Sequence, residues 1–193
     1  LGYARNPELV INFYNERRKQ LLEVRPNDGH LGLAELEADF NVTVVTQNID
    51  NLHERAGSRR IIHLHGELTK VCSSRDPYNP HYIKELKPDE YEVKFGDKAG
   101  DGTQLRPFIV WFGEPVPEIE TAVNYVEKAD IFVIIGTSMN VYPAAGLLNY
   151  VPREAEVYLI DPKPVDVHSM RRIHVIQKGA SEGVRELRSL LQP

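Results

Sequence analysis

A phenol and a guanidinium stand three residues apart in the stretch "FYNERRKQ" (residues 13–20), at Tyr14 and Arg17. Residues three apart lie on one face of a helix, so both side chains would project in the same direction. One possibility is that the pair binds a group that is recognised by a phenol and a cation. The other is that Tyr14 packs inward and Arg17 extends along it on the surface. The neighbouring Arg18 and Lys19 are expected to be solvated. This stretch alone leaves both possibilities open.

Two histidines alternate in "HLHG", at His63 and His65. If the preceding "IIHL" is a strand, both imidazoles face one side and Leu64 faces the other. A metal site needs at least a third ligand, which no second cysteine or H-E-x-x-H pattern supplies. His65 is therefore either a hydrogen-bonded structural residue or a base at the end of a strand, where an imidazole can titrate near neutral pH.

Short polar turns follow several predicted strands. In an open parallel sheet, ligands bind at the carboxyl ends of the strands. Backbone amides and hydroxyls there suit phosphates, and acids or amides suit ribose hydroxyls, so the set fits a nucleotide. A single turn of this kind is weak support, because turns use Gly, Ser, Asn and Asp whatever their function. The turns are "TQNIDNLH", "HGEL", "GEP", "GTSMN" and "DPKP".

Capping residues and apolar runs predict the elements that position these turns. Asn6 and Pro7 begin a helix that runs to about residue 22, and Asn27 or Asp28 begins another. Ser181 is expected to cap the closing helix. Strands alternating with helices predict an α/β fold, with a parallel sheet covered by helices on both faces. The predicted strands are 42–46, 61–64, 108–112, 131–136 (fully buried), 156–161 and 174–177.

Residues 67–106 interrupt this alternation. Pro, Gly, Asp, Lys and Tyr dominate there and the periodicity is poor, so we expect a small lobe with a hairpin. We predict a main domain of residues 27–66 and 107–193, and a smaller lobe that combines residues 67–106 with the helical segment 1–26.

Composition excludes several classes of protein. The chain has 193 residues and a net charge of -5, which gives no electrostatic footprint for nucleic acid or an anionic membrane. It has no apolar run near the roughly 20 residues that span a bilayer. Its single cysteine, Cys72, excludes an internal disulfide and a multi-cysteine metal site. A cytoplasmic location is the expectation.

Five segments in order resemble the sirtuins, which are NAD-dependent protein-lysine deacylases. They are "TQNIDNLHERAG", "IIHLHGEL", "LRPFIVWFGE", "IIGTSMNVYPAAG" and "KGAS". The matches span roughly residues 6 to 186 at compatible spacings, and together they are far more specific than any one alone. The resemblance implies a Rossmann-like NAD-binding domain plus a smaller lobe, with acylated-lysine proteins or peptides as partners.

The resemblance also implies a role for each matching position. His65 matches the family's catalytic base, and His63 is expected to support the strand. Asp161 stands near the adenosine, where many members have Asn. Positions implied to contact NAD are Gln47, Asn48 and Asp50 at the nicotinamide and ribose, Gly136, Thr137 and Ser138 at the ribose and phosphates, and Ala180, after Gly179, at the adenine. Val110, Trp111, Phe112, Gly113 and Glu114 match the segment that pairs with the substrate peptide as an added strand.

The implied reaction makes physical sense at each step. The acyl-lysine carbonyl oxygen attacks C1′ of the nicotinamide ribose and nicotinamide leaves. His65 removes a ribose hydroxyl proton, and water completes transfer to give free lysine and O-acyl-ADP-ribose. An amide and an acid beside the ribose can fix geometry and stabilise developing positive charge.

The chain departs from the family pattern in two ways. Sirtuins usually carry two cysteine pairs that bind a structural zinc, whereas residues 72–103 hold only Cys72, and adding His81 leaves the site short of ligands. We therefore expect no zinc and a lobe held by packing. The opening strand, Gly-Ala-Gly phosphate loop and mobile cofactor loop of the family are also not among these residues; a protein without them should bind NAD poorly. The residues expected to pack the lobe are Tyr78, Tyr82, Tyr91 and Phe95.

The resemblance implies a role for Tyr14 and Arg17 in the choice of the acyl group. Within the sirtuins, Tyr-x-x-Arg at this helix marks members that remove acidic acyl groups such as succinyl and malonyl. An arginine fork can bind the distal carboxylate through two hydrogen bonds and a phenol adds another. We expect desuccinylase or demalonylase activity together with deacetylation. The alternatives are a non-catalytic module that binds NAD or ADP-ribose, and a protein ADP-ribosyltransferase.

Overall fold

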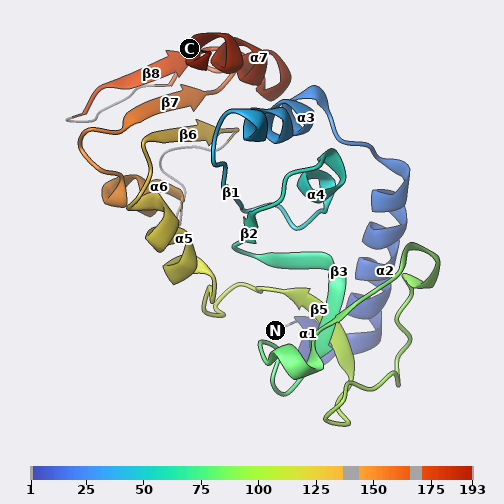
Figure 1. Cartoon of the computed structure of the whole chain (residues 1–193). Coiled ribbons are helices and arrows are strands. Elements are labelled where there is room, and N and C mark those ends of the chain that lie inside the picture. Colours follow the sequence, from blue (N-terminus) through green and yellow to red (C-terminus); the bar gives the residue numbers. More distant parts are fainter. Residues whose placement is uncertain (1, 137–143, 166–170, 193) are drawn as a thin grey trace. The chain divides into compact units, whose positions relative to one another are not determined.

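The computed structural model describes residues 2–136, 144–165 and 171–192, and the chain divides into two compact units (Figure 1). Unit 1 consists of Leu1–Arg25, Thr46–Asn51 and His63–Pro117, and unit 2 of Pro26–Val45, Leu52–Ile62 and Glu118–Pro193. The functional division into residues 27–66 and 107–193 against 1–26 and 67–106 stays a prediction.

A parallel three-stranded sheet lies at the centre of unit 2, in the order β6-β7-β8. Its strands are β6 (Ile131–Ile135), β7 (Glu156–Ile160) and β8 (Ile173–Ile176). Ile135 pairs with Ile160, and Ile160 with Ile176, so the three strands end at the same level. The residues that follow them therefore share one edge of the sheet. The prediction that 131–136 is fully buried is wrong: β6 is an edge strand, and within it only Ile134 is buried.

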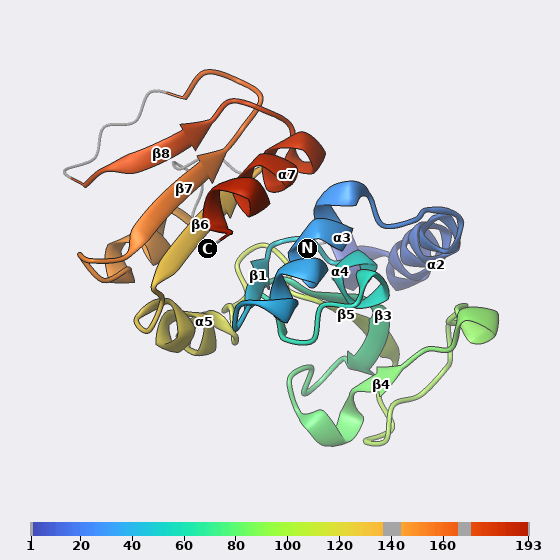
Figure 2. The same cartoon turned by 45° about the horizontal axis from the view of Figure 1, so that its top comes forward.

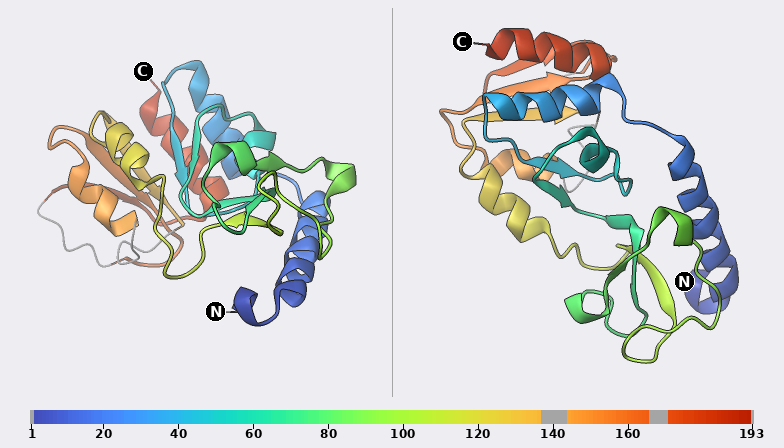
Figure 3. Two further views of the ribbon diagram at one scale, coloured as in Figure 1. Left: turned by 90° about the horizontal axis from the view of Figure 1, so that it is seen from below. Right: turned by 45° about the vertical axis from the view of Figure 1, so that its right-hand side comes forward.

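Helices cover both faces of this sheet, as the α/β prediction requires. In Figures 2 and 3, α3 and α7 lie on one face and α5 and α6 on the other. A core of Ile160, Ile176, Val184 and Leu187 joins α7 to the strands. The helices of unit 2 are α3 (Asp28–Glu35), α4 (Leu52–Ala56), α5 (Ile119–Val126), α6 (Ala144–Leu147) and α7 (Ala180–Leu191), with the short 3₁₀ helices η1 (Leu36–Ala38) and η4 (Leu148–Tyr150).

The predicted helix caps are confirmed at two helix starts, and the prediction is wrong at a third. The Asn6 side chain accepts a hydrogen bond from the Leu9 amide, and the Asn27 side chain accepts one from the amide of His30. The closing helix α7 instead begins at Ala180. Its N-cap residue is Gly179, and no side-chain hydrogen bond caps the helix there. Ser181 lies inside the first turn, so it cannot be the cap.

Unit 1 is built on an antiparallel sheet in the order β4-β3-β5, against which α2 packs. Ile11 of α2 forms a core cluster with Val71 and Val93. A separate two-stranded sheet joins β1 (Val44–Thr46) to β2 (Ile61–His63), and the division between the units passes through both strands. The elements of unit 1 are α1 (Gly2–Arg5), α2 (Pro7–Glu23), β3 (Gly66–Ser73), β4 (Lys84–Glu85) and β5 (Leu105–Ile109), with η2 (Pro80–Tyr82) and η3 (Pro88–Glu90).

Arg18 is buried, contrary to the expectation that it is solvated. Its side chain is 3% exposed and donates hydrogen bonds to the backbone oxygen of Leu68 at 2.9 Å and to Asn15 Oδ1 at 2.8 Å. Burial lowers the pKa of this guanidinium to about 10. Arg18 therefore ties α2 to β3, whereas Lys19 is exposed as expected.

A hydrogen-bonded cluster and the core of Ile11, Val71 and Val93 hold the β4-β3-β5 sheet together. Ser73 donates to Asp101 at 2.5 Å, and Thr103 donates to the same carboxylate at 2.7 Å. These bonds lower the pKa of Asp101 to about 2. Of the aromatic residues expected to pack this region, Tyr78 contacts Phe108 edge-on, but Phe95 is 61% exposed and that part of the prediction is wrong.

No helix within the described ranges 2–136, 144–165 and 171–192 is long and apolar enough to cross a membrane.

Candidate active site

The loop after β1 carries three of the predicted site residues, Gln47, Asn48 and Asp50, in unit 1. The Asn48 amide donates to Thr46 Oγ1 at 3.0 Å, and the Asn48 carbonyl lies 3.1 Å from His63 Nδ1. The Leu64 amide donates to the Thr46 carbonyl at 3.0 Å. His63, which is buried, thus holds the backbone of this loop rather than only its own strand.

His65 lies in the turn between β2 and β3. The strand ends at His63, so the predicted alternation of the two imidazoles along one strand is wrong. Gly66 causes the turn: it has a φ of +90°, which favours glycine, and a Cβ there would lie 2.1 Å from the Phe108 carbonyl oxygen. The chain can therefore turn after β2 and pair at once with β5. His65 is half-buried. Its backbone carbonyl accepts a hydrogen bond from the Val110 amide at 2.9 Å.

The segment Val110 to Glu114 follows β5 and leaves the sheet. The predicted strand 108–112 is therefore wrong at its end, since β5 stops at Ile109. A turn takes its place: the Glu114 amide donates to the Trp111 carbonyl at 2.9 Å, and the Trp111 amide donates to Glu114 Oε1 at 2.7 Å. Gly113 has a φ of +88°, which suits this turn. Phe112 projects fully into solvent.

Arg106 anchors that turn. Its guanidinium binds both carboxylate oxygens of Glu114, at 3.1 and 3.0 Å, and donates to the Ile109 carbonyl at 2.8 Å. It also lies 3.9 Å from the centre of the Trp111 ring. Partial burial alone would raise the pKa of Glu114, but the hydrogen bonds from Arg106 and Trp111 outweigh it and lower that pKa.

Tyr14 and Arg17 lie on α2, as predicted, but in different surroundings. The Trp111 indole Nε1 donates a hydrogen bond to the half-buried Tyr14 hydroxyl at 3.1 Å. Arg17 is exposed, with its guanidinium carbon 6.0 Å from the centre of the Phe13 ring. The alternative in which Arg17 lies along Tyr14 finds no support here, because its ring contact is with Phe13. The structure thus joins Tyr14 to the segment expected to bind a peptide.

The remaining predicted residues follow the strands of unit 2. Gly136 follows β6 and has a φ of +64°, and its amide donates to the Ile160 carbonyl at 3.2 Å. Asp161 follows β7, and its amide donates to the Ile176 carbonyl at 3.2 Å. Ala180 begins α7 after β8. Thr137 and Ser138 lie outside the described residues.

The carboxyl edge of this sheet fits a dinucleotide. Gly136 and Asp161 are neighbours at equivalent register positions, one a small turn and the other an acid. The N-cap residue Gly179 has no side chain to bond the first amides of α7, and no other described side chain caps this helix. Such an edge offers backbone donors for phosphate and a carboxylate for ribose hydroxyls.

A structural zinc site built on two cysteine pairs cannot form in this chain. Cys72 is the chain's one cysteine. It is fully buried, its thiol donates toward the Pro107 carbonyl at 3.7 Å, and burial raises its pKa to about 11. A neutral thiol is a poor zinc ligand. The neighbouring Ser73 and Asp101 are already bonded to one another.

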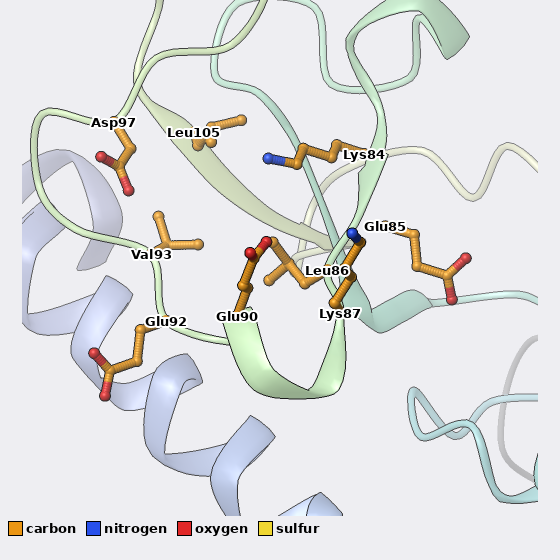
Figure 4. A pocket seen from close by; sticks show the side chains of 9 residues that line it. All are labelled: Lys84, Glu85, Leu86, Lys87, Glu90, Glu92, Val93, Asp97 and Leu105. Carbon is orange, nitrogen blue, oxygen red and sulfur yellow. The ribbon is translucent and has the colours of Figure 1, made fainter.

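A pocket of about 190 Å³ in unit 1 contains none of the predicted site residues (Figure 4). Both lysines and acids line it, which gives no preference for a ligand of either charge. Its lining residues are Lys84, Glu85, Leu86, Lys87, Glu90, Glu92, Val93, Asp97 and Leu105.

Two residues that position the site were missed from sequence. His63 was expected only to support a strand, and Arg106 received no role. A signal was present for Arg106, since an arginine preceding an apolar run in "LRPFIVWFGE", with a glutamate eight residues later, is a candidate buried pair. Which carboxylate it would meet depends on the turn at Gly113.

Comparison with known proteins agrees with this arrangement. A model of the Sir2 family matches residues 2–143. A Bacteroides thetaiotaomicron protein called NAD-dependent protein deacylase is 83% identical over 192 residues, which are 100% of this chain and 82% of that protein. A Helicobacter pylori protein of the same name is 47% identical over 186 residues, covering 96% of this chain and 79% of its own.

Solved structures show the same fold. A Sir2 homologue in complex with NAD matches with a TM-score of 0.79 and 34% identity, over 98% of this chain and 75% of that one. A Sir2 complex with a p53 peptide and NAD+ matches with a TM-score of 0.77 and 27% identity, over 97% of this chain and 79% of that one. The buried turn after β2, the polar edge of the parallel sheet and these matches lead to one conclusion: the chain belongs to the Sir2 family.

Proposed function

We propose that this protein is an NAD-dependent protein-lysine deacylase that removes succinyl and malonyl groups as well as acetyl. Its products are nicotinamide, free lysine and O-acyl-ADP-ribose. The relatives that share 83% and 47% of its residues carry the name NAD-dependent protein deacylase. The observation that carries the acyl preference is the hydrogen bond between Trp111 and Tyr14, because it joins the phenol to the proposed peptide-binding segment. The proposal includes the cytoplasmic location expected from the sequence.

His65 is the proposed catalytic base. A carbonyl–amide hydrogen bond to Val110 fixes its backbone, and the side chain is half-buried, so the imidazole can reach a ligand. NAD supplies the ribose carbon that accepts the acyl oxygen. The imidazole takes the proton from a ribose hydroxyl, a transfer that a positioned base accelerates by about 10²–10⁴-fold.

The NAD contacts are proposed at the two sets of turns. In unit 1, Gln47, Asn48 and Asp50 are assigned to nicotinamide and its ribose, on a loop that His63 holds in place. In unit 2, residues at the carboxyl edge of the parallel sheet are assigned to the other groups of NAD. They are Gly136, Thr137 and Ser138 for ribose and phosphates, Asp161 for the adenosine and Ala180 for the adenine.

The acylated peptide is proposed to bind along Val110, Trp111, Phe112, Gly113 and Glu114. Three of these amides are already used: Val110 bonds to His65, Trp111 to Glu114, and Glu114 to Trp111. The amides of Phe112 and Gly113 have no partner among the described residues, so they are the donors that an added strand would use.

Acyl choice is proposed to come from Tyr14 and Arg17. Arg17 forms no ion pair with the described part of the chain, so its two-pronged donor is available to a carboxylate at the end of the acyl group. An acetyl group has no such carboxylate. The longer acidic acyl groups therefore gain hydrogen bonds that acetyl lacks.

Product analysis tests this function. The full-length protein is incubated with NAD and with acetylated or succinylated peptides, and products are identified by mass spectrometry. O-acyl-ADP-ribose with free lysine supports a deacylase. ADP-ribosylated protein would indicate a transferase instead, and NAD binding without any product would indicate a non-catalytic module.

A further inference from the structure

We propose that Trp111 makes the Tyr14 hydroxyl a hydrogen-bond donor toward the substrate, and that Arg106 and Glu114 hold the indole where it can do so. These three would be positioning residues that favour acidic acyl groups. The inference rests on the proposed function and deepens it, since it says how the phenol acquires its preference.

The direction of the hydrogen bond carries the argument. An indole N–H can only donate, so at 3.1 Å the Tyr14 oxygen must accept from Trp111 Nε1. The phenol's own hydrogen then points elsewhere, and no acceptor for it is found among the described residues. Within the described part of the chain, Tyr14 is therefore a donor without an acceptor.

A carboxylate is the group that matches this arrangement. Ionised carboxylates only accept hydrogen bonds, and the second donor on the same face of α2, Arg17, is cationic. The methyl end of an acetyl group would leave the phenol hydrogen without a partner, which costs free energy once water is excluded. The preference thus follows from the number and direction of donors as well as from charge.

Trp111 is fixed at both its backbone and its ring. Its amide donates to Glu114 Oε1 at 2.7 Å, and the Arg106 guanidinium that binds Glu114 lies 3.9 Å from the indole centre. The Tyr3 ring packs 5.2 Å from the indole as well. Arg106 is 5% exposed, and its two hydrogen bonds to the partly exposed Glu114 hold the pair in a defined geometry.

The alternative is that the Trp111–Tyr14 bond only stabilises unit 1. Stability and selectivity can be separated, because a structural bond would affect both acyl groups equally. The measured quantity is therefore the ratio of kcat/KM for a succinyl-lysine peptide to that for the matched acetyl-lysine peptide, in the full-length protein with saturating NAD.

The main experiment is a double-mutant cycle with Trp111→Phe and Tyr14→Phe. Trp111→Phe keeps an aromatic ring over Arg106 but removes the Nε1 donor. Each single change should lower the succinyl-to-acetyl ratio by about tenfold, the scale of one charge-assisted hydrogen bond. The double change should lower it no further than Tyr14→Phe does, because the indole acts through the phenol. Losses that multiply would overturn the proposal.

Tyr3→Phe is the matched control. It removes only the hydroxyl that bonds to Ser74 at 2.9 Å and leaves the ring against the indole, so the ratio should not change. Arg106→Lys keeps the charge but loses the two-pronged contact with Glu114, and it should lower the ratio in the same direction as Trp111→Phe. An unchanged ratio in a folded Arg106→Lys protein would remove Arg106 from the proposal.

Failure of the proposed function would look different. Wild-type protein that turns over acetyl-lysine but not succinyl-lysine would overturn the acyl preference itself, and the positioning role with it. Wild-type protein that is active on both substrates, with multiplying losses in the cycle, would overturn only the positioning role.

Discussion

Trp111 donates a hydrogen bond to Tyr14 across 97 residues of sequence, with 3.1 Å between the indole nitrogen and the phenol oxygen. The bond joins α2 to the turn that follows β5. The same indole packs on Arg106, which binds Glu114, and the Glu114 carboxylate accepts from the Trp111 amide. A side chain proposed to choose the acyl group and a segment proposed to bind the peptide are thus parts of one hydrogen-bonded unit.

Replacing Arg17 with Met should weaken turnover of succinyl-lysine peptides far more than that of acetyl-lysine peptides. The lost charge-assisted bond contributes about 1.5–3 kcal/mol, or roughly one to two decades in kcat/KM. Steady-state kinetics with both peptides measures this. Lys19→Met is the control, since Lys19 is exposed on the same helix and has no assigned role. Equal losses on both substrates would contradict the acyl preference.

Replacing His65 with Ala should abolish deacylation while leaving the protein folded. The contact that His65 makes to Val110 uses its carbonyl, which alanine retains, so thermal unfolding should change little. The expected fall in kcat is at least about 100-fold, because a general base is lost. Circular dichroism and the kcat measured with saturating NAD check both parts. A near-normal rate would remove His65 from the mechanism.

Stability at low pH should depend on Asp101. Its pKa is lowered from 3.8 to about 2 by hydrogen bonds from Ser73 and Thr103, so the folded state favours the ionised carboxylate. That contribution is present above about pH 4 and is lost as the pH falls toward 2. The gap in Tm between wild type and Asp101→Asn should therefore be largest near neutral pH and close between pH 4 and 2. The exposed Asp89→Asn should show no such gap, and a gap that widens on acidification would refute the assignment.

Treatment with a metal chelator should leave the β4-β3-β5 sheet intact. The two cysteine pairs of a structural zinc site are missing from this chain, and hydrogen bonds of Ser73 connect the end of β3 to Asp101 and Thr103, in the segment before β5, instead. Dialysis against a chelator should leave Tm unchanged. In addition, the buried Cys72 thiol, with its pKa raised to about 11, should react with a disulfide reagent only after unfolding. Zinc at one equivalent, with a fall in Tm on chelation, would show that a site exists after all.

Local signals in the sequence predicted much of this fold. The caps at Asn6 and Asn27 were correct because a capping side chain bonds within three residues of itself. The apolar runs gave β6, β7 and β8 to within a residue or two, and with them the edge that carries Gly136 and Asp161.

Two features that were predicted wrongly depend on tertiary contacts: the end of the strand before Trp111 and the burial of Arg18. The strand through Trp111 looked continuous, but a carboxylate three residues later binds its amide and turns the chain. Arg18 looked solvated by residue type alone. Its position seven residues after Ile11 and three before Leu21, both buried, places it on the inward face of α2, and that periodicity could have revealed its burial.

The glycine beside the proposed base has a consequence for how this protein tolerates mutation. Gly66 contributes no functional group, yet any side chain there would meet the Phe108 carbonyl and a backbone conformation that only glycine readily adopts. In a scan of random substitutions, position 66 should therefore be as intolerant as His65 itself. The two intolerant neighbours would be told apart by protein yield, since a change at His65 removes chemistry whereas a change at Gly66 removes the pairing of two strands.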